Sequence, residues 1–74
     1  MTVSIELFGQ LSPQSPRHQT LDLASRITVQ EAALALGLNP EEIGLVTING
    51  VQSEMQDLVL IDCRLCFFPY VSGG

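Results

Sequence analysis

Apolar and polar residues alternate at the start of the chain, where polar side chains separate Val3, Ile5 and Leu7. A period of two is typical of a β-strand with one buried face. Residues 9–18 contain two prolines, two serines and a glycine, which predicts a loop because proline interrupts both helices and strand pairing. Alternation resumes over residues 20–24. The pattern therefore predicts a β-hairpin with a long, irregular connection.

A helix-start signal follows at Thr28, where the run Thr-Val-Gln-Glu matches a capping box. In this motif the Thr28 hydroxyl accepts a hydrogen bond from the Glu31 amide, and the Glu31 carboxylate accepts one from the Thr28 amide. Apolar residues then recur at helical spacing, and Gly37 supplies the left-handed residue that ends such a helix. We expect this helix to pack on the sheet. Asn39-Pro40 repeats the start signal and predicts one further short turn.

The next segment predicts a second hairpin. Residues 45–48 are mostly apolar, and Asn49-Gly50 follows them directly. Asn-Gly favours a two-residue hairpin turn because both central residues must adopt positive φ. We expect the returning strand to begin at Val51.

The last third of the chain predicts a final strand over residues 65–70, entered through a turn at residues 62–64. Pro69 lacks an amide donor and marks the point where regular pairing ends. Residues 58–61 fit either a short edge strand or a buried link. The order of elements predicts an α+β fold, with a mixed sheet of four to five strands and one main helix on one face. We expect one domain over residues 1–74.

Strand parity assigns the phenylalanines to different faces of this sheet. Phe8 falls opposite the face that carries the apolar residues of the first strand. The same parity places Leu65 and Phe67 inward and Phe68 outward. Two outward phenylalanines on so small a domain often mark an interaction surface. The alternative is a bulge or twist that buries one of them.

Eight acidic and three basic residues give a net charge of −5 at pH 7. This charge opposes binding to phosphate backbones and argues against a nucleic-acid partner. A basic protein partner fits better, although modest acidity also keeps small proteins soluble. No apolar run reaches the ~18 residues that span a bilayer, and the first residues lack a signal-peptide pattern. We expect a cytoplasmic protein with no membrane partner.

Cys63 and Cys66 have the spacing of a redox or metal pair. Residues three apart on a strand point to opposite faces, so their thiols should diverge. His18 is distant in the sequence, and no other ligand-type residue completes a zinc site. We therefore predict no metal site and two small apolar cysteines.

The chain closes with Val71, Ser72, Gly73 and Gly74, which we expect to form a flexible tail. Glycine has no Cβ, so a Gly-Gly end can enter a channel too narrow for a side chain and deliver its α-carboxylate there. The alternative is a frayed terminus in which small residues accumulate.

With this tail, the run over residues 67–74 resembles the small subunit of molybdopterin synthase, one of the ubiquitin-like sulfur carriers. Weaker agreement lies at residues 7–10 and 46–50, and the similarity in architecture covers the whole chain. The resemblance implies a ubiquitin-like β-grasp fold. It also implies a C-terminal glycine, here Gly74, that is adenylated and converted to a thiocarboxylate. The sulfur would serve biosynthesis of the molybdenum cofactor.

Carried over by position, Gly74 bears the sulfur and the residues before it contact partners. Those implied contact residues are Phe8, Phe68, Pro69, Tyr70, Val71, Ser72 and Gly73. The implied partners are an ATP-using adenylyltransferase of the ubiquitin-activating type and the large subunit of molybdopterin synthase. The chain itself would be a non-catalytic carrier that binds no cofactor or metal, and this agrees with the absence of a phosphate-binding motif.

Three departures from the family pattern bear on the choice of partner. Cys63 follows Asp62 where Asp-Gly-Asp is usual, and Tyr70 replaces a second proline. Prolines also replace the arginine-rich turn after the first strand. The alternatives are a carrier for a thiazole or tungsten-cofactor pathway, a ubiquitin-related modifier conjugated through Gly74, and a plain binding module.

Overall fold

The computed structural model describes residues 2–9, 11 and 16–70. Its first two strands, β1 (Thr2–Leu7) and β2 (His18–Asp22), form the predicted antiparallel hairpin. The second strand lies two residues earlier than residues 20–24. Because Thr2 at the start of β1 pairs with Asp22, the register ends β2 before Leu23.

The helix α1 (Val29–Ala35) begins and ends at the predicted signals. Both hydrogen bonds of the capping box are present, between the Glu31 amide and the Thr28 hydroxyl (3.2 Å) and between the Thr28 amide and the Glu31 carboxylate (3.0 Å). These bonds from Thr28 hold the pKa of Glu31 below its ordinary value. Gly37 has φ of 80° and ends the helix. A single 3₁₀ turn, η1 (Pro40–Glu42), follows, capped by Asn39.

The second hairpin joins β3 (Ile43–Ile48) to β4 (Val51–Ser53). Asn49 and Gly50 have φ of 53° and 83°, as predicted for the two-residue turn. β3 begins two residues before the predicted start because Ile43 pairs with Pro69 on the final strand.

Residues 58–61 form no strand, and only Val59 among them is buried, whereas Leu58, Leu60 and Ile61 are exposed. Val59 is completely buried, and its amide donates to the carbonyl of Ile27 (2.8 Å). Asp62 adopts φ of 56° in the turn that leads into β5 (Arg64–Pro69). Tyr70, predicted to be in this strand, lies just beyond it, and Pro69 is the last paired residue, as expected.

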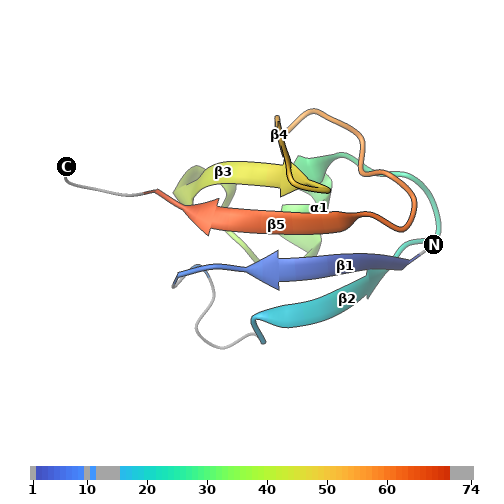
Figure 1. Ribbon diagram of the computed structural model, residues 1–74, viewed down its shortest axis with the longest axis horizontal. Coiled ribbons are helices and arrows are strands. Elements are labelled where there is room, and N and C mark those ends of the chain that lie inside the picture. Colours follow the sequence, from blue (N-terminus) through green and yellow to red (C-terminus); the bar gives the residue numbers. More distant parts are fainter. Residues whose placement is uncertain (1, 10, 12–15, 71–74) are drawn as a thin grey trace.

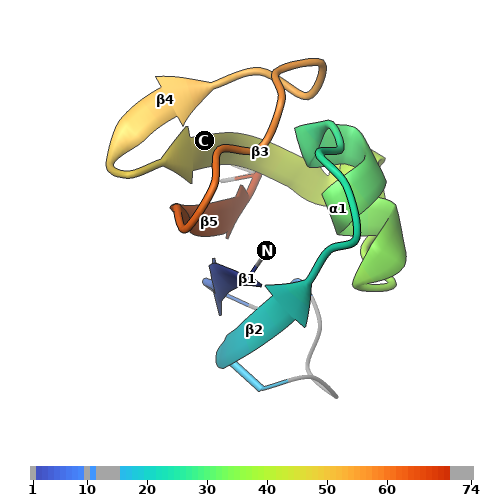
Figure 2. The same ribbon diagram turned by 90° about the vertical axis from the view of Figure 1, so that its right-hand side faces the viewer.

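The five strands have the order β2-β1-β5-β3-β4, with β1 and β5 parallel and every other pair antiparallel. The helix covers one face of this mixed sheet (Figure 1). Figure 2 looks along the strands and shows the helix on one side of the sheet. Between them lies the core, which includes Val3, Ile5, Leu7, Val29, Ala32, Ala33, Val46, Ile48, Val59, Leu65 and Phe67. The architecture is the predicted ubiquitin-like β-grasp fold.

The two cysteines point to opposite faces, as predicted. Cys63 lies in the core beneath the helix, whereas Cys66 is buried outside that cluster. Both are free thiols. Desolvation raises the pKa of the Cys63 thiol, so it behaves as a small apolar side chain.

The capping box makes a testable contribution to stability. Replacing Thr28 by Ala removes the hydroxyl that accepts from the Glu31 amide, and should lower the free energy of unfolding by about 1 kcal/mol. Thr28→Ser keeps the hydroxyl and should retain most of that stability. Urea unfolding of the three proteins measures the difference. Equal midpoints for the Ala and Ser variants would contradict this role.

Candidate functional site

Phe8 and Phe68 lie side by side on the sheet face opposite the helix. The Phe8 amide donates to the carbonyl of Phe67 (3.0 Å) and so extends the parallel pairing of β1 with β5 by one residue. This brings the two rings into a stack, with centroids 4.5 Å apart and planes 7° apart. Both residues are half-buried, whereas Leu65 and Phe67 are completely buried in the core. The predicted parity is confirmed.

The rings shield one another, which reduces the exposed apolar area without a bulge. Arg17 adds to this shielding, since its guanidinium carbon lies 5.9 Å from the Phe8 ring centroid. A cation at this distance is attracted to the face of the ring. The result is a pre-formed aromatic platform of Phe8 and Phe68, flanked by a positive charge.

A shallow hollow of about 440 Å³ lies beside this platform. Its lining comes from β3, β5, the turn after β3 and the residue after β1. The lining residues are Phe8, Thr47, Asn49, Gly50, Arg64, Cys66 and Phe68. Aromatic rings at one end and a guanidinium at the other suit the side chains of a protein partner better than an enclosed small molecule.

A cluster of charged residues on the same sheet face was not predicted from the sequence. Glu6 is only 8% exposed. It accepts two hydrogen bonds from Arg64 (3.2 and 3.3 Å) and lies 3.1 Å from Nδ1 of His18. Parity does place Glu6 on the face of Phe8, but its partners follow only from the pairing of β1 with both β2 and β5. Arg64 thus belongs to both the charged cluster and the hollow.

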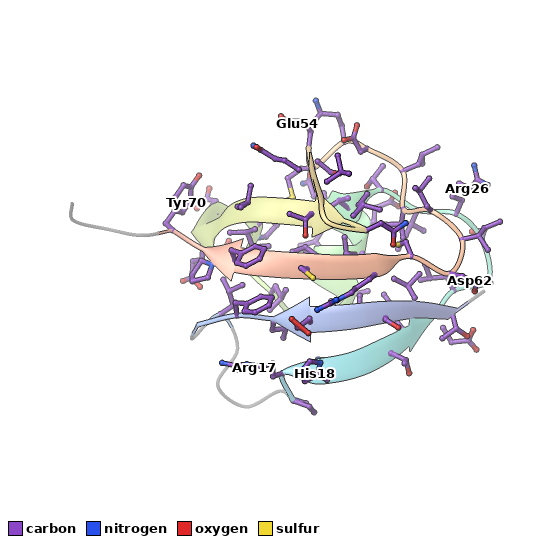
Figure 3. All side chains as sticks on the ribbon, viewed as in Figure 1. Arg17, His18, Arg26, Glu54, Asp62 and Tyr70 are labelled. Carbon is purple, nitrogen blue, oxygen red and sulfur yellow. The ribbon has the colours of Figure 1, made fainter. Side chains whose placement is uncertain are left out.

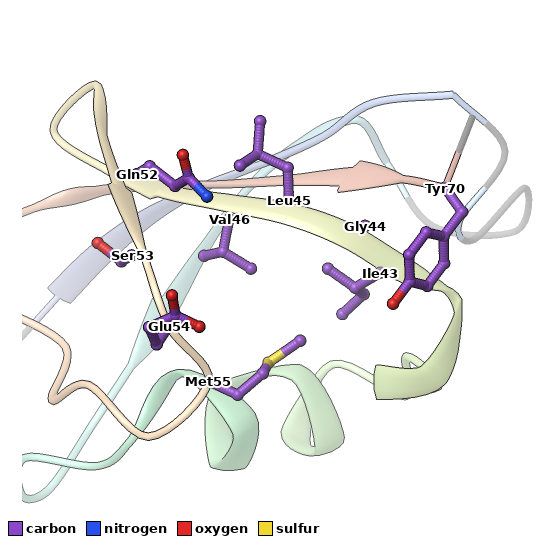
Figure 4. Close-up of a pocket in the computed structure, with 9 residues that line it drawn as sticks. All are labelled: Ile43, Gly44, Leu45, Val46, Gln52, Ser53, Glu54, Met55 and Tyr70. Atoms are coloured by element: carbon purple, nitrogen blue, oxygen red, sulfur yellow. The ribbon is translucent and has the colours of Figure 1, made fainter.

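Pro69 and Tyr70 lie where β5 leaves the sheet, at the end of the molecule opposite Asp62 (Figure 3). Tyr70 is 66% exposed, and its amide donates to the carbonyl of Glu42 (3.3 Å). A small pocket of about 190 Å³ lies between the start of β3 and the segment after β4, with Tyr70 at its rim (Figure 4). Glu41 and Glu42 line a neighbouring hollow together with Tyr70. Acidic residues therefore border the exit, the point where the chain leaves the sheet after β5.

The remaining predicted site residues, Val71, Ser72, Gly73 and Gly74, lie outside the described residues. Within the described ranges, no three His, Cys, Asp or Glu residues are grouped so that they could hold a metal ion. In the same ranges, no helix has the length and apolar character needed to cross a bilayer.

Comparison with known proteins identifies the fold of this chain but not the pathway in which it acts. No family model matches the sequence, and no curated protein does so either. The crystal structure of SAMP1 from Haloferax volcanii superposes with a TM-score of 0.77 at 25% identity, covering 100% of each chain. A structure of H. volcanii small archaeal modifier protein 1 gives 0.75 at 22% identity, covering 95% of this chain and 98% of that one. These likenesses support the ubiquitin-like β-grasp fold. The molybdopterin pathway stays a prediction.

The contact between the two rings can be measured without any partner. A double-mutant cycle of Phe8→Ala and Phe68→Ala should give a coupling of about 0.5–1.5 kcal/mol in the free energy of unfolding. Phe8→Ala combined with Leu60→Ala serves as the control, since Leu60 lines a different hollow. Additive effects of the two phenylalanine substitutions would mean that the stack contributes nothing to stability.

Proposed function

We propose that this protein is a ubiquitin-like sulfur carrier that acts through the carboxylate of Gly74. In this proposal an ATP-using enzyme adenylates Gly74, and the adenylate becomes a thiocarboxylate that donates sulfur in molybdopterin biosynthesis. The observation that carries the proposal is the placement of the stacked Phe8 and Phe68 beside the end of β5, from which the chain continues to Gly73 and Gly74. A docking surface thus adjoins the segment that would be delivered.

The chemistry requires a carrier with little machinery of its own. The Gly74 carboxylate attacks the α-phosphorus of ATP, a C–O–P linkage forms and pyrophosphate departs. Hydrosulfide, supplied by a sulfur donor, then attacks the acyl carbon, so that a C–S bond forms, AMP leaves and the thioacid loses its proton to become the thiocarboxylate. The carrier's part is to bind and to present an end slim enough to reach the partner's active site.

In the same proposal the chain is not itself an enzyme and binds no cofactor. ATP belongs to the activating enzyme, and the cytoplasm is where that enzyme would find it. The large subunit of molybdopterin synthase would accept the loaded carrier. Of the surface features described above, the aromatic platform suits both partners because stacked rings offer a rigid apolar anchor. The acidic side chains near Tyr70 suit a basic partner surface.

A second candidate is a protein modifier conjugated through Gly74. The observation that favours it is the name of one structural neighbour, the small archaeal modifier protein 1 of H. volcanii. The same adenylate would serve, because a lysine amine that attacks the acyl carbon yields an isopeptide bond with loss of AMP. Carriers for thiazole or tungsten-cofactor pathways use the same end group and differ only in the final acceptor.

Changing the length of the tail tests the proposal directly. Deleting Gly74, or adding one residue after it, should abolish sulfur transfer because the reacting carboxylate no longer reaches the partner's active site. The thermal midpoint should not change, since the tail lies beyond the last strand. Leu60→Ala, remote from the aromatic platform, is the control and should transfer sulfur normally. Normal transfer by the deletion variant would refute the proposal.

Mass spectrometry of protein isolated from its own cells separates the two candidates. A carrier should show a population in which sulfur replaces one oxygen at Gly74. A modifier should instead appear in larger conjugates in which trypsin leaves residues 65–74 attached to a lysine, because Arg64 is the last basic residue of the chain. Conjugates without any thiocarboxylate would favour the second candidate over the first.

A further inference from the structure

The backbone at Pro69 and Tyr70, where the chain leaves the sheet, passes between two glycines. A Cβ placed on Gly44 would lie 2.9 Å from Cα of Tyr70, 3.0 Å from the carbonyl oxygen of Pro69 and 3.1 Å from the Tyr70 nitrogen. On the other side, a Cβ on Gly9 would lie 2.6 Å from Cγ of Pro69. Below 3.0 Å something must shift: at Gly44 this is the backbone of Pro69 and Tyr70, and at Gly9 it is the ring of Pro69.

Gly44 sits at an irregularity in the pairing of β3 with β5. Ile43 pairs with Pro69 and Leu45 with Phe68, so Gly44 is an extra residue between them. Its φ is not positive, so backbone conformation does not require glycine at this position. The requirement is space, because the atoms that a Cβ would meet belong to the backbone of Pro69 and Tyr70 and cannot rotate away.

The other described turn glycines show the contrast. Gly37 and Gly50 have φ of 80° and 83°, and a Cβ on either would meet nothing within 4 Å. Their role is to allow the turns after α1 and β3. Gly9 combines both features, since its φ is 65° and Pro69 fills the space beside it. Close approach to the exit of β5 is therefore specific to Gly9 and Gly44.

We propose that Gly9 and Gly44 are positioning residues that fix the direction in which the chain leaves the sheet after Tyr70. The hydrogen bond from the Tyr70 amide to the Glu42 carbonyl adds a third restraint on that direction. This inference rests on the proposed function and deepens it, because the direction of exit determines where Gly74 is presented. In this proposal the aromatic platform binds the partner, whereas Gly9 and Gly44 set the direction of the chain after Tyr70.

Small changes at this exit should have large effects at the reacting group. When the partner holds the four tail residues extended, they span at most about 14 Å, and a turn of about 10° at their start moves their end by about 2 Å. A misplacement of about 1 Å can cost roughly 10²-fold in rate, because the reacting atoms must be aligned. A carrier of this kind therefore gains from a rigid exit even if the tail beyond it adapts to the partner.

The test is the kinetics of adenylate formation on the Gly44→Ala variant, with a cognate activating enzyme and ATP. We expect kcat to fall roughly 10- to 100-fold while KM changes by less than about twofold, because Phe8 and Phe68 keep the binding surface. Gly37→Ala is the matched control: it adds the same methyl group, with backbone strain but no contact at the exit, and should keep both constants. Phe68→Ala should give the opposite split, a raised KM. Equal kcat values for Gly44→Ala and Gly37→Ala would overturn the proposal.

A structural readout keeps this test separate from the proposed function. Hydrogen exchange at the Tyr70 amide should be faster in Gly44→Ala than in the wild type and unchanged in Gly37→Ala. If the wild type is not adenylated at all, the proposed function fails, while the exchange rates still test the restraint at the exit. Unchanged Tyr70 exchange and an unchanged amide chemical shift in Gly44→Ala would overturn the restraint.

Gly9→Ala provides a second route if Gly44→Ala does not fold. The atom that its Cβ would meet is Cγ of Pro69, so Pro69→Ala removes the clash. Gly9→Ala should lower kcat when Pro69 is present, and should have no further effect when Pro69 is already replaced by Ala. An equal loss of kcat in both backgrounds would assign the effect to backbone strain at Gly9 and would contradict the proposal for that residue.

Discussion

The pairing of β5 on both of its edges is the constraint from which the other features follow. This strand is parallel to β1 on one side and antiparallel to β3 on the other, so its register is fixed twice. With that register set, Leu65 and Phe67 must enter the core and Phe68 must face outward. The last strand of the fold is thereby hydrogen-bonded on both edges, up to the residue where the chain leaves the sheet.

The same pairing explains why the outer face carries two different surfaces. Parallel alignment places Phe8 next to Phe68 at the end of both strands, where the rings stack. Nearer the start of β5, Arg64 reaches across to Glu6 on β1. An apolar anchor therefore lies close to the exit, and a charged cluster lies farther along the sheet. Glu6 is buried and already accepts hydrogen bonds from Arg64 within the chain, so the half-buried platform is the stronger candidate for binding energy.

Local sequence signals predicted much of the fold. The capping box at Thr28, the helix end at Gly37 and the turn at Asn49-Gly50 each depend on a few contiguous residues, and all three are present. Strand bounds were less accurate, because β2 and β3 begin where cross-strand partners exist rather than where the alternating pattern begins. Periodicity alone could not assign residues 58–61, whose role depends on a hydrogen bond to Ile27.

The features of the candidate site that the sequence did not predict all involve residues far apart in the chain. Strand parity predicts that Phe8 and Phe68 face outward, but they become neighbours only through the parallel pairing of β1 with β5. The partners of Glu6 are His18 on β2 and Arg64 on β5. Gly44 on β3 lies against Pro69 and Tyr70 at the end of β5. A glycine needed for close approach looks in the sequence like any other glycine.

The central claim is that the fold presents Gly74 as a reactive carboxylate to an activating enzyme. Incubation of the wild-type protein with a cognate enzyme and ATP, followed by mass analysis of its C-terminal peptide, tests this most directly. We predict one AMP group on that peptide, lost again when a sulfur nucleophile is added. An unmodified peptide in the presence of active enzyme would contradict the account.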